Sequence, residues 1–470
     1  MHIKDCNTYF RERELTMYLS NRGYAIPKAS LSPNEIQSIK KELTVKPYTY
    51  GPNTADASQY FIFQESINTL YVPKAYGLKR FGVSNLIRKN EDKIQDICSE
   101  IHFLGKLREE QEQPVNDILD ACHDPCKRGG LLNIFCGGGK TTMALYTLTK
   151  LGKKCAIVVH KDFLLNQWKE RIYEFLGDKV RVGLIKGKVI DIDDKDIVLI
   201  SLQSLAMKEF DRGLFSTFGT IVFDEVHHTS AEVFNRALFK VSFLYTIGLT
   251  ATITRKDGLS KVFIWHLGDV VYKSVQRSDM VQVEIIPYYN HDVRYCTEEY
   301  MYNNKPNYVK MVNNICFFDE RNESIKNRVL ALLELERDRK ILVLSDRVKQ
   351  LTDLKARFDL VNPDIAGVYR GGMGADALKQ SEQKQVILAT FAIASEGYDQ
   401  KGLNTLVLAS PKSDIVQSVG RILRDKEEDR IIIPLIIDFA DDFGMFRSQG
   451  KKRCAYYKKC KYSVKVVSDD

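Results

Sequence analysis

The sequence predicts an α/β protein with two open parallel sheets in tandem, each covered by helices. Two series of short, continuous apolar runs alternate with amphipathic segments whose length suits a helix. A short apolar run without polar alternation is typical of a strand that is buried on both faces. Because neighbouring parallel strands need a long crossover connection, usually a helix, each series predicts one α/β domain.

The predicted strands form two groups, separated by a region in which apolar runs and amphipathic segments do not alternate in this way. The first group comprises Leu131–Phe135, Cys155–Val159, Ile197–Ser201, Thr220–Phe223 and Tyr245–Leu249. The second group comprises Ile341–Ser345, Ile365–Tyr369, Val386–Thr390, Leu403–Ala409 and Ile431–Ile437. Each group is long enough to form a sheet of its own.

The remaining segments are expected to form smaller parts. A helix-prone stretch, Ser32–Leu43, and short aromatic runs predict a small α+β accessory domain near the N-terminus. Lys46–Ser58 is predicted to be a loop because it is rich in Pro, Gly, Asn and Tyr. The expected domains are an accessory domain (1–100), a first α/β domain (101–273), a connecting region (274–335), a second α/β domain (336–446) and a basic C-terminal segment (447–470).

Composition and cysteine usage are typical of a folded intracellular protein. The chain has 470 residues, 44% hydrophobic and 28% charged, which allows several domains with sizeable cores. No run approaches the roughly 20 apolar residues of a membrane span, and charges interrupt the N-terminus where a signal peptide is apolar. Ten cysteines without a secretory signal are interpreted as reduced thiols. We therefore expect an intracellular protein that is not secreted and has no membrane partner.

Two local features have competing interpretations. Cys122, His123 and Cys126 are possible metal ligands, but the second ligand pair of a structural zinc site is missing, so a loop with incidental thiols is favoured. The segment from Arg447 to Lys465 holds eight Lys and Arg and no acid, which equals the whole net charge of +8. Because tyrosines lie between these cations, the segment suits phosphate binding with base stacking. A solvated, disordered basic tail is the alternative.

A glycine-rich loop follows the predicted strand Leu131–Phe135 and precedes a predicted helix. Residues 136–142 read CGGGKTT. Glycines let backbone N–H groups approach phosphate oxygens, and the following helix N-terminus favours an anion. Lys140 is expected to reach the β- and γ-phosphates of a nucleotide, and Thr141 to place its hydroxyl on Mg²⁺. The full GxxxxGK[ST] pattern is not met, because Ile134 occupies its first glycine position.

Two acids and two arginines complete the candidate chemistry. Asp224 and Glu225 directly follow the strand Thr220–Phe223, at the sheet edge where open α/β folds bind ligands. An Asp on the metal and a Glu positioning the attacking water suit nucleotide hydrolysis. Arg421 and Arg424 lie three residues apart and are expected on one helical face, where their guanidinium groups suit phosphate charge.

Together these motifs resemble superfamily 2 helicases, over about residues 107–438. The resemblance implies two RecA-like domains, the first binding ATP and Mg²⁺ through Thr141 and Asp224, the second supplying Gln417 and the arginine fingers Arg421 and Arg424. The catalytic set it implies is Lys140, Asp224, Glu225, Gln417, Arg421 and Arg424. The implied ATP-binding set is Arg108, Gln111, Cys136, Gly137, Gly138, Gly139, Lys140, Thr141, Thr142, Gly397 and Asp399, where Gln111 reads the base and Asp399 contacts the ribose.

The same resemblance implies residues that contact the nucleic acid and couple it to hydrolysis. Nucleic-acid contacts are implied for Lys161, Gln203, Arg347 and Thr390. Coupling is implied for His227, Thr250 and Thr252, with His227 contacting Gln417. Position 253 is Ile where many members have Pro, which departs from the family pattern in the coupling segment.

Residues 224–228 (DEVHH) and 250–258 (TATITRKDG) are similar to one branch of the superfamily. That branch includes XPB-type DNA helicases and the transcript-release helicases of poxviruses and other large DNA viruses. The segments at residues 46–47 and 71–73 and the Tyr/Lys-rich end favour the viral group. The implied function is an ATP-dependent DNA helicase of 3′ to 5′ polarity in viral transcription or in DNA repair and recombination. Its implied partners are DNA and the transcription machinery, at a cytoplasmic replication site of the host cell and in the virion.

Three other functions compete with that of a DNA helicase. An RNA helicase would use the same motifs, since DExH motors act on both nucleic acids. An ATPase that remodels protein–nucleic-acid complexes without separating strands is also compatible with them. An inactive scaffold is disfavoured, because Lys140, both acids, Gln417 and both arginines are all present.

Overall fold

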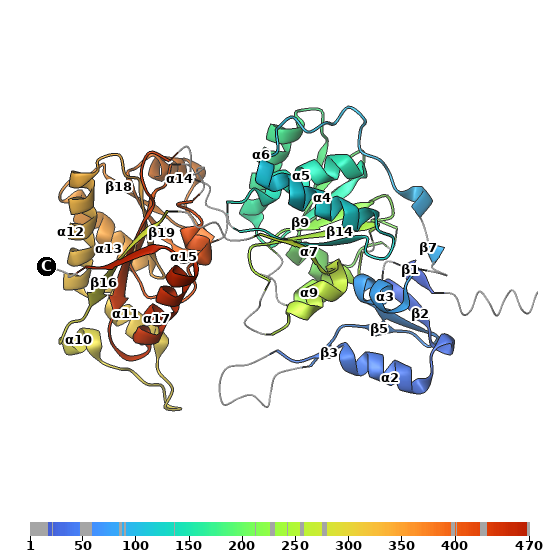
Figure 1. Cartoon of the computed structure of the whole chain (residues 1–470), viewed down its shortest axis with the longest axis horizontal. Helices are drawn as coiled ribbons and strands as arrows, with labels where there is room; N and C mark the ends of the chain where they lie inside the picture. Colours follow the sequence, from blue (N-terminus) through green and yellow to red (C-terminus); the bar gives the residue numbers. More distant parts are fainter. Residues whose placement is uncertain are drawn as a thin grey trace, which may run out of the picture. The chain divides into compact units, whose positions relative to one another are not determined.

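The computed structural model divides the chain into two compact units, Met1–Ser274 and Val275–Asp470 (Figure 1). It describes residues 17–467 apart from 21, 48–58, 84–86, 89–90, 136, 212, 226–230, 242, 254–257, 275–279, 396–399, 401 and 424–429. Most of the predicted loop Lys46–Ser58 therefore lies outside the described residues. In the part of the chain that the structure describes, no helix has the length and apolar character of a membrane span.

The first unit is built on an eight-stranded sheet with the order β11-β10-β12-β9-β13-β14-β8-β15. Its strands are β8 (Gly129–Asn133), β9 (Cys155–Val159), β10 (Val182–Lys186), β11 (Val189–Asp191), β12 (Ile197–Ser201), β13 (Thr220–Phe223), β14 (Tyr245–Thr250) and β15 (Val270–Lys273). All neighbours pair in parallel except β10 and β11. The predicted parallel α/β architecture of this half is confirmed.

Helices cover both faces of this sheet. They are α4 (Glu109–His123), α5 (Lys140–Leu151), α6 (Asp162–Leu176), α7 (Leu202–Met207), α8 (Ala231–Leu238) and α9 (Ser260–Leu267). One apolar core joins α4, α5 and α6 to the sheet, and a second core joins α7, α8 and α9 to it. Because both faces are covered, the central strands are apolar throughout, as continuous runs predict.

The accessory region packs onto this α/β domain within the first unit. It forms the sheet β5-β6-β2-β1-β7 and a β3-β4 pair. Its elements are β1 (Tyr18–Ser20), β2 (Gly23–Pro27), η1 (Lys28–Ser30), α2 (Pro33–Glu42), β3 (Thr44–Val45), β4 (Tyr60–Phe61), β5 (Gln64–Glu65), β6 (Thr69–Val72), α3 (Lys74–Phe81), β7 (Ile87–Arg88) and η3 (Glu91–Lys93). The predicted helix at Ser32–Leu43 is α2, which begins with a capping box between Ser32 and Glu35.

A buried lysine anchors the accessory region. Lys74, at the start of α3, is 6% exposed, and its Nζ donates to the carbonyl oxygens of Phe243 at 2.9 Å and Leu244 at 2.8 Å. Leu259 and Val262, beside and within α9, also belong to the accessory region's own apolar core. The accessory region and the first α/β domain therefore form one compact body.

The second unit carries a seven-stranded sheet with the order β18-β19-β17-β20-β21-β16-β22, in which every pair is parallel. Its strands are β16 (Gln282–Tyr288), β17 (Ile341–Ser345), β18 (Ala366–Tyr369), β19 (Val386–Thr390), β20 (Thr405–Leu408), β21 (Leu435–Asp441) and β22 (Ser463–Val466). Its helices are α10 (Val293–Cys296), α11 (Tyr308–Cys316), α12 (Asp319–Leu335), α13 (Val348–Asp359), α14 (Ala375–Glu382), α15 (Phe391–Ser395), α16 (Val416–Val419) and α17 (Gly444–Lys459).

Three expectations for this half are corrected. The last predicted strand, Ile431–Ile437, begins at Leu435, after Pro434, and Ile431 is 98% exposed. The predicted connecting region, residues 274–335, supplies β16, which lies between β21 and β22. The basic C-terminal segment is neither a separate part nor a disordered tail, because it forms most of α17 and the edge strand β22. Hydrogen bonding along β16 makes both segments part of the sheet.

Candidate nucleotide site and strand-contacting edges

The glycine-rich loop joins the carboxyl end of β8 to the first turn of α5. Gly137 and Gly139 have φ values of +85° and +82°, which side chains other than glycine rarely adopt. A Cβ on Gly139 would lie 2.1 Å from Nε2 of Gln111, and one on Gly138 would lie 2.5 Å from Cγ2 of Ile134. The loop therefore requires these glycines. It leads into α5, whose first turn holds Lys140, Thr141 and Thr142 with helix N–H groups that suit an anion. Cys136 lies outside the described residues.

The start of α4 holds this loop in place. Gln111 is 3% exposed, and its Nε2 donates to the carbonyl oxygen of Gly138 at 3.1 Å. Its Oε1 accepts from the backbone N–H of Arg108 at 3.0 Å, which fixes the amide orientation. The guanidinium of Arg108 donates to the carbonyl oxygen of Gly137 at 3.4 Å. Two residues implied for ATP binding, one of them Gln111 for the base, thus contact the loop itself.

The two predicted acids lie against the loop. Asp224 and Glu225 directly follow β13, and Oε1 of Glu225 lies 2.5 Å from Nζ of Lys140. Glu225 has a φ of +48°, an unusual backbone conformation for a residue with a side chain. Oδ2 of Asp224 accepts a hydrogen bond of 2.9 Å from Nε1 of Trp168 on α6. The structure therefore brings Lys140, Asp224 and Glu225 together.

The contact from Trp168 was missed by sequence reasoning. Because Trp168 is 56 positions away from Asp224 in the chain, local pattern does not pair them. The indole is 2% exposed and offers a single donor, so it fixes one oxygen of the carboxylate.

Burial of Asp224 raises its pKa to about 6, and the neighbouring charge of Glu225 contributes to the rise, while Lys140 and the Trp168 hydrogen bond oppose it. A carboxylate that is costly to ionise favours a nearby cation. Mg²⁺ usually takes only one or two protein ligands beside water and phosphate oxygens. No cluster of three or more His, Cys, Asp or Glu suited to a metal occurs among the described residues. Asp224 and Thr141 therefore fit a magnesium ion that arrives with a nucleotide.

The coupling segment lies next to the strand that carries the loop. β14 pairs in parallel with β8, and its last residue, Thr250, is in register with Asn133. Thr250 Oγ1 donates to the carbonyl oxygen of Thr252 at 2.7 Å and accepts from its N–H at 3.2 Å. These contacts form a tight turn directly beside the loop. His227, also implied in coupling, lies outside the described residues.

The implied strand-contacting residues lie at the carboxyl edges of both sheets. In the first unit, Lys161 follows β9 and Gln203 follows β12. These two strands are adjacent, and both residues are exposed. In the second unit, Arg347 follows β17, whose Ser345 is in register with Thr390 at the end of β19. The guanidinium of Arg347 donates to Oδ1 of Asn313 on α11 at 2.6 Å.

The arginine segment differs from the expected helix. α16 ends at Val419, Gly420 is its C-cap, and residues 420–423 form turns. Gln417 lies on α16, and Arg421 follows it with 7% of its surface exposed. Arg421 and Arg424 were expected on one face of a helix. This expectation is wrong for Arg421, because α16 ends before it. Arg424, Gly397 and Asp399 lie outside the described residues.

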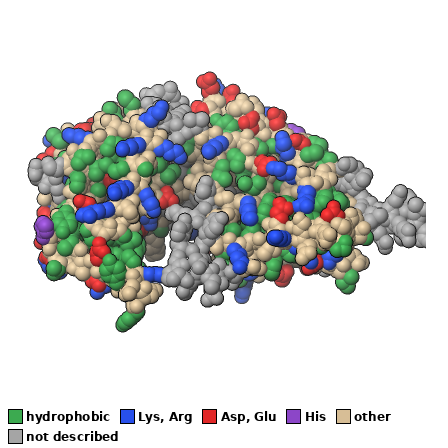
Figure 2. All heavy atoms as spheres, turned by 60° about the horizontal axis from the view of Figure 1, so that its bottom comes forward, with side chains coloured by type: hydrophobic (Ala, Val, Ile, Leu, Met, Phe, Trp, Pro, Cys, Tyr) green, Lys and Arg blue, Asp and Glu red, His purple; other side chains and the backbone are tan. Residues whose placement is uncertain are grey.

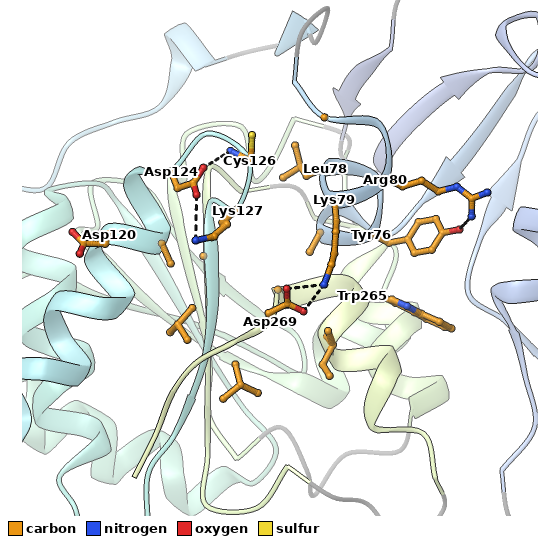
Figure 3. A pocket seen from close by; sticks show the side chains of 18 of the residues that line it. Tyr76, Leu78, Lys79, Arg80, Asp120, Asp124, Cys126, Lys127, Trp265 and Asp269 are labelled. Atoms are coloured by element: carbon orange, nitrogen blue, oxygen red, sulfur yellow. Dashed lines mark hydrogen bonds and ion pairs between the residues drawn. The ribbon is translucent and has the colours of Figure 1, made fainter.

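A large cavity of about 1390 Å³ opens elsewhere in the first unit. Figure 3 shows Tyr76, Lys79 and Arg80 of α3 on one side, Asp120 and Asp124 at the end of α4 on another, and Trp265 of α9 near Asp269. Gly129, the first residue of β8, lines the cavity. The glycine-rich loop follows Asn133, the last residue of the same strand. The cavity thus lies at the opposite sheet edge and is separate from the nucleotide site.

The fold and this candidate site are typical of the helicase class. A family model described as "Type III restriction enzyme, res subunit" matches residues 104–255, which include the loop and both acids. The solved structure of S. cerevisiae Dbp5 bound to RNA and ADP BeF3 has the same fold, with a TM-score of 0.54, 13% identity, and coverage of 78% of this chain and 91% of that one.

Sequence relatives identify the family. A protein of Acanthamoeba polyphaga mimivirus, named as an ATP-dependent RNA helicase, is 34% identical over 456 residues, which cover 94% of this chain and 85% of that protein. The DNA 3'-5' translocase XPB2 of Sulfurisphaera tokodaii is 32% identical over 172 residues, 36% of each chain. The chain belongs to the superfamily 2 helicases, which as a family hydrolyse ATP and bind nucleic acid. Within them it belongs to the XPB-like branch that includes helicases of large DNA viruses.

Proposed function

We propose that the chain is an ATP-dependent DNA translocase and helicase, and that Lys140, Asp224 and Glu225 form its hydrolytic centre. The observation that carries this proposal is the ion pair between Lys140 and Glu225, next to Asp224 and beside a loop whose conformation requires glycine. Each of these groups has a defined task in phosphoryl transfer.

The roles follow from the position of each group. The ammonium of Lys140, now held by Glu225, is released to the nucleotide phosphates when they enter the loop. Glu225 is then free to orient the attacking water and accept its proton. Asp224 and Thr141 would hold a magnesium ion, which would supply charge neutralisation at the phosphates. Trp168 keeps the carboxylate of Asp224 in one orientation, and Arg108 and Gln111 keep the loop in place for the base.

The second unit supplies the remaining groups of the proposed cycle. We assign Gln417, Arg421 and Arg424 to the nucleotide, and Arg347 and Thr390 to the nucleic-acid backbone. Lys161 and Gln203 form the matching contacts on the first unit. Thr250 and Thr252 transmit the nucleotide state, because their turn lies beside the strand that carries the loop.

DNA is the preferred substrate, with translocation from 3′ to 5′. The archaeal relative XPB2 is named a DNA 3'-5' translocase, which supports both assignments. RNA is the second candidate, because the mimivirus relative is named as an RNA helicase. Transcript release in a virus, with contacts to the transcription machinery inside the infected cell, is the proposed setting.

The test is an ATPase assay with single-stranded DNA, duplex DNA and RNA, together with strand-displacement substrates of both polarities. DNA is expected to stimulate hydrolysis, and only substrates with a 3′ loading strand are expected to be unwound. Lys140→Ala removes the activity, whereas Lys150→Ala, on the exposed last turn of the same helix, leaves it unchanged. Stimulation by RNA alone would establish the second candidate. Hydrolysis that survives Lys140→Ala contradicts the proposed centre.

A further inference from the structure

The C-terminal segment that forms α17 and β22 carries the chain's excess positive charge. Residues 447–465 contain eight Lys and Arg and no acid, so the rest of the chain is formally neutral. Two of these cations are paired: Arg453 with Asp438 at 2.8 Å and Arg447 with Asp442 at 2.7 Å. The other six, Lys451, Lys452, Lys458, Lys459, Lys461 and Lys465, have no ion-pair partner among the described residues, and all are exposed.

Helical geometry groups four of these lysines on one surface. Positions seven apart lie two turns apart on the same face, about 10.5 Å along the axis. Lys451 and Lys458 are such a pair, and Lys452 and Lys459 are another. Between the pairs the only exposed side chain is Ala455, which leaves room for close approach. Figure 2 shows one face of the molecule with its Lys and Arg side chains in blue.

The tyrosines of the same segment point away from this surface. Tyr457 is fully buried and donates to Oδ2 of Asp438 at 2.9 Å, and Tyr462 is 7% exposed. Both belong to the apolar core that α17 shares with the sheet, and Tyr456 packs against that core. The expectation that these rings stack on bases is therefore wrong. The lysine surface offers charge without an aromatic platform.

A surface of this kind suits a duplex better than a single strand. Proteins that grip single strands combine cations with exposed rings on which bases stack. A duplex has its bases paired inside and presents one negative charge per roughly 1.7 Å of axis. Four lysines in two pairs neutralise such phosphates without reading sequence.

The surface extends away from the edge that carries Arg347 and Thr390. α17 starts just after the carboxyl end of β21 and ends before β22, whose first residue, Ser463, is in register with Gln282, the first residue of β16. Lys458 and Lys459 thus lie toward the amino edge of the sheet. A duplex on this face is bound beyond the strand-contacting edge.

We propose that Lys451, Lys452, Lys458 and Lys459 form a sequence-independent binding surface for duplex nucleic acid, separate from the strand-contacting edge of the motor. This inference rests on the proposed nucleic-acid motor. It adds a surface that holds the paired part of a substrate.

The test compares the full chain with the variant in which these four lysines are replaced by alanine. Duplex affinity at about 0.1 M salt is expected to fall at least ~10-fold, and the slope of log K against log salt to fall by about 0.9 for each phosphate that the variant no longer neutralises. Affinity for single strands and ATP hydrolysis without nucleic acid are expected to change less than about twofold. A Lys→Arg version of all four positions should restore duplex affinity.

A matched control removes the same charge elsewhere. Lys79, Lys326, Lys355 and Lys384 each pair with a carboxylate in the structure, and their joint replacement by alanine should leave duplex affinity near that of the unmodified chain. Equal weakening in the control and test variants contradicts the proposal, as does equal weakening for single strands and duplexes. Reduced binding to phosphatidylserine vesicles with intact duplex affinity would make the surface a membrane-binding one and overturn it. Absence of nucleic-acid binding by the unmodified chain would instead refute the motor.

Discussion

At the scale of single residues, Lys140 and Glu225 form an ion pair with each other in the structure. Their ion pair of 2.5 Å is largely buried, with 12% and 19% of the side chains exposed. In the proposed mechanism, phosphate oxygens compete with Glu225 for the ammonium, so nucleotide binding would require this ion pair to break. The two residues therefore affect nucleotide binding in opposite directions.

Glu225→Gln is expected to lower the rate of ATP hydrolysis by about 100-fold or more, because the variant lacks the base and water-orienting group. ATP affinity should stay equal or increase, since Lys140 is no longer held by a charge. Lys140→Ala should weaken ATP binding by roughly tenfold or more, which corresponds to removal of one charged hydrogen bond. Fluorescent-nucleotide titration and single-turnover hydrolysis separate the two effects. Weaker binding in Glu225→Gln would contradict the proposed competition.

Asp224 links activity to stability through its raised pKa. Its pKa of about 6 in the folded chain exceeds the ordinary value of 3.8, so the folded state holds the proton more tightly than the unfolded state. The resulting stabilisation is present below about pH 4 and is lost as pH rises through about 6. At neutral pH the ionised carboxylate therefore destabilises the fold.

Asp224→Asn is expected to raise the unfolding free energy at pH 7.5 by roughly 1–3 kcal/mol while abolishing hydrolysis. The amide keeps an oxygen for the indole of Trp168. The gain over the unmodified chain should shrink as pH falls from 6 to 4, as measured by denaturant unfolding at each pH. A gain that is constant with pH would show that ionisation of Asp224 is not its cause.

At the scale of elements, α17 is held by one buried ion pair. Arg453 and Asp438 are 3% and 1% exposed, and Tyr457 donates to the same carboxylate. Removing Arg453 leaves the buried carboxylate of Asp438 with the hydrogen bond from Tyr457 but without an opposite charge, and the energetic cost of that exceeds the net stabilisation by the ion pair.

Arg453→Met is expected to destabilise the second unit by about 3–5 kcal/mol, because Asp438 is left without its partner. Lys451→Met, half a turn away on the exposed face of the same helix, should change stability by less than about 0.5 kcal/mol. Thermal unfolding followed by circular dichroism measures both. Similar small effects of the two substitutions would show that the pair does not hold the helix.

The same contrast between buried and exposed positions explains what sequence alone could predict. β9, β12, β13, β17 and β19 have the predicted bounds because strands buried on both faces leave continuous apolar runs. The edge strands β11 and β22 are exposed along their whole length, so their sequences carry no such signal. β16 lies inside the sheet, but two of its positions, Gln282 and Pro287, are exposed, so its sequence lacks a continuous apolar run.

The candidate site follows the same logic. Lys140, Asp224 and Glu225 were predicted because each closely follows a recognisable strand. The contacts of Trp168 with Asp224 and of Gln111 with Gly138 depend on how distant segments pack, which local patterns do not contain. Arg421 illustrates the limit in another way: the helix expected through it ends at Gly420.

At the scale of the whole molecule, each unit has apolar cores of its own. The cores of the first unit lie on both faces of its sheet and beneath the accessory region. Those of the second unit are built around β17 and its neighbours and around α11. The glycine-rich loop and both acids belong to the first unit alone.

Calorimetry is therefore expected to resolve two unfolding transitions. Ile157→Ala should lower the midpoint temperature of one transition and Leu342→Ala that of the other. Each substitution truncates a fully buried side chain and should reduce the unfolding free energy of its unit by about 2–5 kcal/mol. A non-hydrolysable ATP analogue with Mg²⁺ should raise the transition that Ile157→Ala lowers. A single transition that both substitutions lower would show that the units unfold together.

The position of β16 also determines when the second unit can finish folding during synthesis. Gln282, its first residue, is in register with Leu435 and Ser463, about 150 and 180 positions later in the chain. At a synthesis rate of roughly 5–20 residues per second, the first partner strand of β16 is made on the order of ten seconds after β16 itself. Throughout that time a strand destined for the interior of a sheet has both edges open to other chains. The sheet of the first unit, complete at Lys273, can therefore close long before that of the second unit.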